Sequence, residues 1–179
     1  MSTDILQKSA PASTITRAAA GALIAAVHTA AARIGFTAAV AVTDPGGHLK
    51  AFDRADDALF LTAEVALDKA WTAASFQTPT HTWNDHLANP RLSPLAGHPR
   101  LMAVGGGYPI VENGRCLGGL GVSGGSYEQD QQAAEEALTA LGFELQTGRP
   151  SSDRGRPPCR LAAAPGAVPV RGRGVVCGP

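Results

Sequence analysis

Apolar residues recur at helical spacing over the first part of the chain and predict a helix that ends at Ile34. Its apolar stripe consists of Leu23, Val27 and Ile34, with Ile15 and Ile24 at the edges. Ser13 or Thr14 is suited to cap the start of this helix, and Gly35 is suited to end it. A second face is nearly flat, because it carries Ala18, Gly21, Ala25, His28 and Ala32. Such a face permits close approach by another helix, another chain or a planar ligand.

Two short segments rich in apolar residues follow and predict a hairpin. They cover residues 38–43 and 48–52, and Asp44-Pro45-Gly46-Gly47 joins them. Proline followed by glycine suits a type II turn. A second helix is predicted at 59–76. Because Glu64, Asp68 and Lys69 are its only charged residues, it is expected to be buried on more than one side.

The stretch 77–100 is longer than most connections and contains four prolines, three histidines and Trp83. This composition predicts a binding loop or a lid, with one short helix at 82–87. The apolar run 101–104 then predicts a strand.

The glycine-rich run 105–125 predicts a second hairpin. Its strands cover 108–111 and 116–122, and Asn113-Gly114 between them is a strong turn signal. The second strand carries several glycines, which weaken a strand unless something approaches its backbone closely. A packed helix, a second subunit or a flat ligand would each account for them.

Ser126 and Gln129 predict a capping box at the start of a last helix, which Gly142 ends. The predicted order is therefore helix, two strands, helix, loop with a short helix, three strands, helix. Because tight turns join the neighbouring strands, the fold class is α+β with an antiparallel sheet of five strands.

The chain has 179 residues and a formal net charge of zero, which hides an asymmetry. Residues 149–179 hold six arginines and one aspartate, so the preceding part is mildly acidic. An acidic body without a basic stripe argues against a nucleic-acid partner. We expect a flexible N-terminus over 1–12, one domain over 13–146, and a disordered Arg/Pro/Gly-rich tail over 147–179.

The three cysteines do not form a disulfide framework or a zinc motif, and Cys116 has no evident partner base. Neither a signal peptide nor a spanning helix is predicted, so we expect a cytoplasmic protein without a membrane partner.

Histidine and lysine supply the candidate chemistry. His81 and His86 are five residues apart, a spacing that does not place two ligands on one helix face. With His98 they could converge only through the folding of the loop. Lys69 either reaches solvent or is buried against a carboxylate or an anionic ligand. His28 is the only strong axial donor on the flat helix face, where haem would find an imidazole beside an apolar wall. A subunit contact or plain exposure to solvent would also account for His28.

Three motifs resemble the GlcG/HbpS family, which includes the C-terminal domain of PduO-type proteins. They are VAVTDPGGHL at 40–49, DKAWTAASF at 68–76, and GGGYPI at 105–110 with GGLGVSGG at 118–125 and Glu128-Gln129-Asp130. The resemblance covers residues 14–146. It implies a profilin-like fold with a five-stranded antiparallel sheet and assembly into dimers or larger rings. It also implies haem binding, in some members through a histidine of the first helix. The loop with His81, Trp83, His86 and His98 is this chain's own elaboration.

Three functions are consistent with the sequence. The first is a small oligomeric haem or tetrapyrrole binder. Its cofactor site would comprise His28 as the ligand of haem iron, Lys69 near a propionate, and Gly106, Gly107 and Tyr108. The second is an enzyme acting on a small anionic substrate, with His81, His86 or His98 as acid or base. The third is a non-catalytic accessory or assembly subunit.

Overall fold

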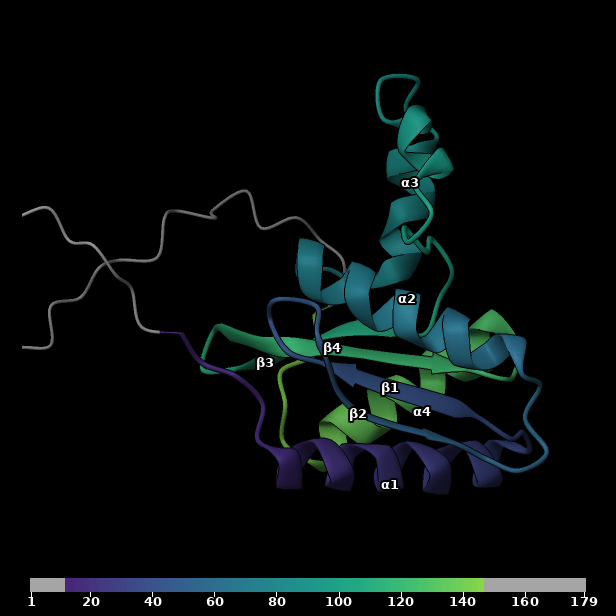
Figure 1. Cartoon of the computed structure of the whole chain (residues 1–179), viewed down its shortest axis with the longest axis vertical. Coiled ribbons are helices and arrows are strands. Elements are labelled where there is room, and N and C mark those ends of the chain that lie inside the picture. Colours follow the sequence, from purple (N-terminus) through teal and green to yellow (C-terminus); the bar gives the residue numbers. More distant parts are fainter. Residues whose placement is uncertain (1–11, 147–179) are drawn as a thin grey trace, which may run out of the picture. The chain divides into compact units, whose positions relative to one another are not determined.

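The computed structural model describes residues 12–146 of the chain (Figure 1). The expected tail over 147–179 and the N-terminal segment before Ala12 lie outside the described residues. The elements are, in order, α1 Arg17–Ile34, β1 Ala39–Thr43, β2 Leu49–Arg54, α2 Leu61–Phe76, η1 Thr80–Thr82, α3 Trp83–Leu87, η2 Ser93–Gly97, β3 Gly107–Glu112, β4 Arg115–Ser123 and α4 Tyr127–Ala140. The fold class is α+β, as predicted.

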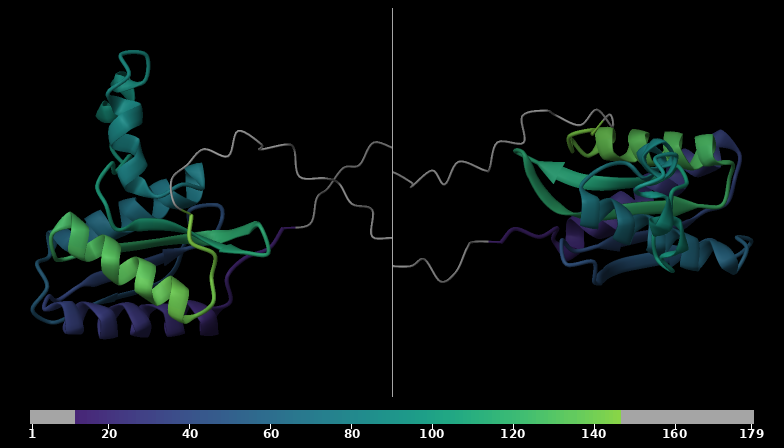
Figure 2. Two further views of the ribbon diagram at one scale, coloured as in Figure 1. Left: turned by 180° about the vertical axis from the view of Figure 1, so that it is seen from behind. Right: turned by 90° about the horizontal axis from the view of Figure 1, so that it is seen from above.

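A four-stranded antiparallel sheet with the order β2-β1-β4-β3 forms the middle layer. Helices α1 and α4 cover one face of this sheet, and α2 covers the other (Figures 1 and 2). The larger core lies between the sheet and the α1/α4 pair. Its strand residues include Val40, Val42, Ile110, Leu120 and Val122.

The predicted five-stranded sheet is wrong by one strand, because residues 101–104 do not join a ladder. Side chains bind this segment instead: the Met102 N–H donates to Thr72 Oγ1 (3.0 Å), and Thr80 Oγ1 donates to the Val104 carbonyl oxygen. A run of four apolar residues is too short for its periodicity to distinguish a strand from a packed loop. This segment returns the chain from the arm formed by η1, α3 and η2, which projects from the α2 side of the sheet (Figure 1).

The helix starts follow capping chemistry. Thr16, and neither Ser13 nor Thr14, caps α1, since its Oγ1 accepts a hydrogen bond from the Ala19 N–H (3.1 Å). Ile15 precedes this cap and is 1% exposed, so it anchors the start of the helix in the core. The predicted capping box of Ser126 and Gln129 is confirmed.

The glycines of β4 let α2 lie directly on the sheet. A Cβ atom at Gly119 would overlap the carbonyl oxygen of Ala70, and one at Gly121 would overlap that of Ala66. Of the explanations open from the sequence, a packed helix is therefore the one realised at these two positions.

The outer edge of β3 is blocked along its length. The Gly107 N–H donates to Thr80 Oγ1 (3.0 Å), Pro109 has no N–H, and the Val111 carbonyl oxygen accepts from the Glu144 N–H (2.9 Å). Proline is tolerated here because β3 is an edge strand. Another strand therefore finds few free backbone groups along this edge.

The glycine contacts predict opposite effects for two substitutions to alanine. Gly121→Ala should cost about 3 kcal/mol of unfolding free energy or more, because α2 would have to move off the sheet. Gly21→Ala should stabilise by roughly 0.5–1 kcal/mol, since a Cβ atom there meets nothing within 4 Å and alanine favours the helix. Urea denaturation measures both effects. Equal effects of the two substitutions would contradict the close packing of α2 on β4.

Candidate functional site

His28 lies on the outer side of α1, next to the edge strand β2. Its side chain is 26% exposed, and its Nε2 atom is 2.8 Å from Asp53 Oδ2 of β2. The contact is not aligned as a hydrogen bond, so Nε2 is a buried nitrogen without a hydrogen-bond partner. An imidazole nitrogen in this state can pair with a carboxylate when protonated, or ligate a metal when neutral.

The surface of α1 around His28 is as flat as the sequence predicts. Ala25 lies one turn before the histidine, Ala32 lies one turn after it, and both are exposed. Gly21, one further turn toward the N-terminus, has open space around it. His28 thus stands beside an exposed wall of small residues, with Asp53 on its other side.

Lys69 takes a different place, in the interior between α2, the sheet and α4. Its Nζ donates hydrogen bonds to Asp130 Oδ2 (2.7 Å) and to the Val122 carbonyl oxygen (2.8 Å). The side chains of Lys69 and Asp130 are 1% and 4% exposed. Asp130 Oδ1 also accepts from the Gly125 N–H (2.9 Å). Of the two placements predicted for a buried Lys69, the structure shows the internal carboxylate.

Burial acts on both members of this pair. Desolvation lowers the pKa of Lys69 and raises the pKa of Asp130, and the attraction between the two groups opposes each shift. The pair connects α2 to α4 across the end of the sheet. Removing one partner would leave an uncompensated buried charge, which is far more costly than removing both.

The other predicted cofactor residues are also internal. Gly106 has φ 107° and leaves room for Lys69 and Asp130, because a Cβ atom there would lie 3.0 Å from Lys69 Nζ and 2.7 Å from Asp130 Cβ. Gly107 leaves room for Thr80. Tyr108 is 1% exposed and its hydroxyl donates to Glu135. Burial, followed by this contact, raises the pKa of Tyr108.

The sheet separates the residues predicted as one cofactor site. His28 belongs to α1 on one face, whereas Lys69 belongs to α2 on the other. The structure therefore does not bring the Lys69 ammonium group to His28. Of the predicted cofactor residues, His28 is the only one whose side chain borders the outer surface of α1.

The three loop histidines do not converge. The ring of His81 lies 6.1 Å from that of Tyr108, the ring of His86 packs edge-on against Trp83 at 5.2 Å, and that of His98 stacks on Trp71 at 5.7 Å. Residues 12–146 contain no group of three His, Cys, Asp or Glu side chains placed to hold a metal ion. No acid–base pair among these three histidines is formed.

His98 and Arg100 instead bind the end of the arm to α2. The Arg100 guanidinium lies over the Trp71 ring at 4.9 Å, and its Nε donates to Asp68 Oδ1 (2.9 Å). The His98 ring and the Arg100 guanidinium thus both contact the Trp71 indole, and these contacts pack the end of the arm against α2.

Sequence reasoning missed the two carboxylates that contact His28 and Lys69, which are Asp53 and Asp130. Asp53 and Asp130 lie 25 and 61 positions from their partners His28 and Lys69, and other carboxylates are close to each of them in the sequence. A lysine on a mostly apolar helix leaves both solvent exposure and a buried partner open, and it does not identify the partner.

The fold and these sites define an α+β domain with one imidazole on an otherwise flat helix face. The chain belongs to the HbpS-like family, whose model is described as haem degrading protein HbpS-like and matches residues 15–139. This confirms the resemblance to the GlcG/HbpS family.

Three relatives are similar in sequence. An uncharacterised 15.0 kDa protein from the dhaT-dhaS intergenic region of Citrobacter freundii is 37% identical over 137 residues, which cover 74% of this chain and 96% of that protein. GlcG of Escherichia coli K12 is 36% identical over 58% of this chain and 77% of its own length. The corrinoid adenosyltransferase PduO of Salmonella typhimurium is 38% identical over 57% of this chain, but the match spans only 31% of PduO.

Two solved structures share the fold. The protein ORFY of Klebsiella pneumoniae has a TM-score of 0.71 and 34% identity, covering 76% of this chain and 97% of that one. A complex of PduOC with haem has a TM-score of 0.70 and 29% identity, covering 74% of this chain and 99% of that one. Within the described residues, no helix combines the length and the apolar character that crossing a membrane requires.

The buried pair predicts a stability change that depends on pH. Lys69→Met should cost about 3–5 kcal/mol at pH 7, because Asp130 stays buried without its partner. Without Lys69, the pKa of Asp130 in the folded protein rises further above its ordinary value. The folded state then binds this proton more tightly than the unfolded state, so the cost should shrink as the pH falls toward 4.

Urea denaturation of the parent and the variant at pH 7 and at pH 4.5 measures this difference. Lys50→Met is the matched control, since Lys50 is an exposed lysine of β2 and its loss should change stability by less than about 0.5 kcal/mol. A cost for Lys69→Met that is the same at pH 7 and pH 4.5 would show that the orphaned carboxylate is not its cause.

Proposed function

We propose that this protein is a small oligomeric haem- or tetrapyrrole-binding protein. The observation that carries the proposal is the match to PduOC, a protein crystallised with haem, over 99% of that chain at a TM-score of 0.70. The description of the family model, a haem-degrading protein, points to the same ligand. What these relatives bind is the basis for expecting haem here.

His28 fits the role of the axial ligand. Its Nε2 atom is buried beside the Asp53 carboxylate (2.8 Å) without an aligned hydrogen bond, and exposed small residues extend along α1 on either side of the histidine. A neutral imidazole beside a flat apolar wall is the donor set that haem iron accepts. When bound, haem would supply an iron centre whose chemistry depends on this ligand and on the polarity around it.

Asp53 would compete with such a ligand. It covers Nε2 of His28, but its own side chain is 61% exposed and can turn toward solvent at little cost. Lys69 is not included in this proposal as a partner of a propionate, because Asp130 and Val122 already accept its hydrogen bonds.

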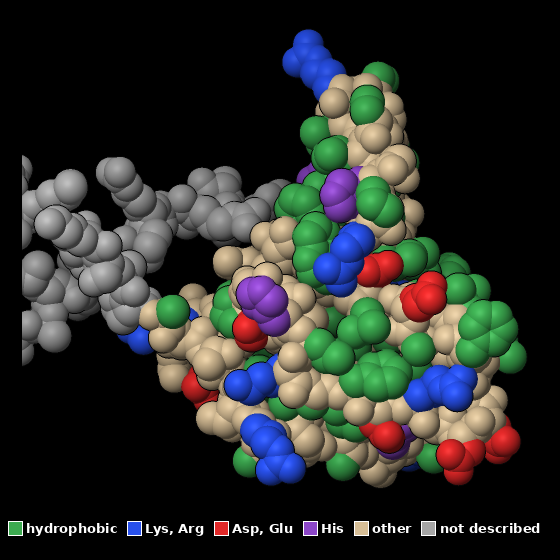
Figure 3. Space-filling model, in the orientation of Figure 1, with side chains coloured by type: hydrophobic (Ala, Val, Ile, Leu, Met, Phe, Trp, Pro, Cys, Tyr) green, Lys and Arg blue, Asp and Glu red, His purple; other side chains and the backbone are tan. Residues whose placement is uncertain are grey.

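The proposal also includes an oligomer and a cytoplasmic location. Hydrophobic side chains gather on the face shown in Figure 3. At the start of α2, Leu59, Phe60 and Leu61 are 74%, 83% and 56% exposed, which is unusual for a run of three large apolar residues. A second copy that covers such a surface would remove it from water.

Haemin titration of the purified protein tests the proposal. We expect a Soret band in the parent protein and at least about a tenfold loss of affinity in His28→Ala, because the iron loses its axial ligand. Asp53→Ala should bind haemin more tightly than the parent, since it uncovers Nε2.

His48→Ala is the matched control, because His48 also lies beside an aspartate, with Nδ1 3.3 Å from Asp44 Oδ1, but on an exposed turn. It should leave the titration unchanged. Absence of a Soret band in the parent would contradict haem binding. An unchanged band and affinity in His28→Ala would contradict only the role of His28 as the axial ligand.

A further inference from the structure

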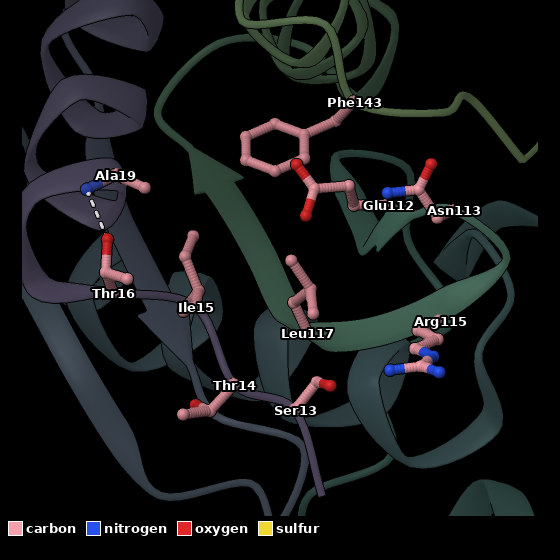
Figure 4. A pocket seen from close by; sticks show the side chains of 10 residues that line it. All are labelled: Ser13, Thr14, Ile15, Thr16, Ala19, Glu112, Asn113, Arg115, Leu117 and Phe143. Carbon is pink, nitrogen blue, oxygen red and sulfur yellow. Dashed lines mark hydrogen bonds between the residues drawn. The ribbon is translucent and has the colours of Figure 1, made fainter. Parts of the chain in front are cut away.

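A pocket lies between the start of α1 and the turn of the β3–β4 hairpin, and neither His28 nor Lys69 lines it. Its volume is about 720 Å³, within the range of roughly 300–1,000 Å³ of small-molecule sites. Figure 4 shows its lining side chains, which come from the segment before α1, from both strands of the hairpin, and from Phe143 beyond α4.

The apolar part of the lining is held in place by the fold. Ile15 is 1% exposed, and its N–H donates to the carbonyl oxygen of Leu117 (2.9 Å), which fixes the segment before α1 against β4. Leu117 and Phe143 are each half-buried and pack against the main core. Of these three side chains, Leu117 and Phe143 offer an apolar surface to a ligand in the pocket, and Ile15 supports them from the core.

The charged part of the lining consists of Arg115 and Glu112, which face each other across the hairpin ladder. Both are exposed. Within residues 12–146 no carboxylate lies within 4 Å of the Arg115 guanidinium, so it forms no ion pair there. The nearby Glu144 already accepts a hydrogen bond from the Gly114 N–H (3.0 Å). Arg115 is therefore available to an anion, while Glu112 repels additional negative charge.

Haem iron does not fit this lining. The residues around the pocket include no histidine, cysteine, methionine or tyrosine, so an axial ligand is missing. The pocket is distinct from the surface around His28, which lies about three turns further along α1.

We propose that this pocket binds a small amphipathic monoanion, a carboxylate with an apolar body. The carboxylate pairs with Arg115, and the apolar body packs on Leu117 and Phe143. Glu112 makes a second negative charge unfavourable, so dicarboxylates and phosphates are disfavoured relative to a monocarboxylate.

Octanoate is a suitable probe, with octanol and suberate as matched molecules without a charge and with a second charge. Titration of the full-length, isotope-labelled protein, followed by amide NMR, should shift the signals of Leu117 and Phe143 with octanoate and much less with the other two. Arg115→Gln should weaken octanoate binding about tenfold, because a charge-assisted hydrogen bond is lost. Glu112→Gln should strengthen it about two- to threefold, because a repulsion is removed.

Arg91→Gln is the control, since Arg91 is an exposed arginine of the arm, and it should leave octanoate binding unchanged. Thermal unfolding of each variant establishes that it is folded. The proposal is overturned if octanol binds as well as octanoate, if the Arg115 and Glu112 variants match the parent, or if octanoate shifts no pocket signal. Displacement of octanoate by haemin would also overturn it, since the pocket would then belong to the haem site.

Discussion

The close approach of α2 to β4 is the constraint on which the rest of the structure depends. Glycine at positions 119 and 121 leaves space for the carbonyl oxygens of Ala70 and Ala66, so the helix backbone rests on the strand backbone. Because α2 packs this closely on β4, the Lys69 side chain reaches past the end of the sheet to Asp130 of α4. Helices on opposite faces of the sheet are thereby connected by one buried ion pair. Gly106 provides the remaining space that this pair needs.

The same arrangement separates the buried polar groups, such as Lys69 and Tyr108, from the accessible ones, such as His28 and Arg115. The glycine-rich hairpin serves the packing of α2, and its polar neighbours are satisfied internally, as Lys69 and Tyr108 are. The proposed ligand sites lie elsewhere: on the other side of the sheet, where α1 presents His28 beside small residues, and at the hairpin turn, where Arg115 borders a pocket. Binding at either place would leave the packing of α2 on β4 undisturbed.

Most of the fold could be predicted from local patterns. The turn at Asp44–Gly47, the Asn113-Gly114 hairpin and the capping box of Ser126 are determined by a few adjacent residues, and the structure contains all three. The predicted type II form of the first turn is wrong, because Gly47, and not Gly46, has the positive φ (79°). The segment 101–104 was mistaken for a strand because its hydrogen bonds go to the Thr72 and Thr80 side chains, which are distant in sequence. The candidate site was predicted less completely. His28 was identified from the flat helix face, but its neighbour Asp53 and the pocket at Arg115 were not.

The sequence by itself therefore determined the helices, the hairpins and the small-residue surfaces, because periodicity, turn residues and caps act within a few positions. Only the tertiary structure decided which surfaces are covered. It placed α2 on the glycines of β4, paired Lys69 with Asp130, and left the alanine face of α1 open. A glycine within a strand indicates a close neighbour, and a lysine on an apolar helix needs a countercharge if it is buried. Which group fills that role depends on long-range packing, and no local pattern contains that information.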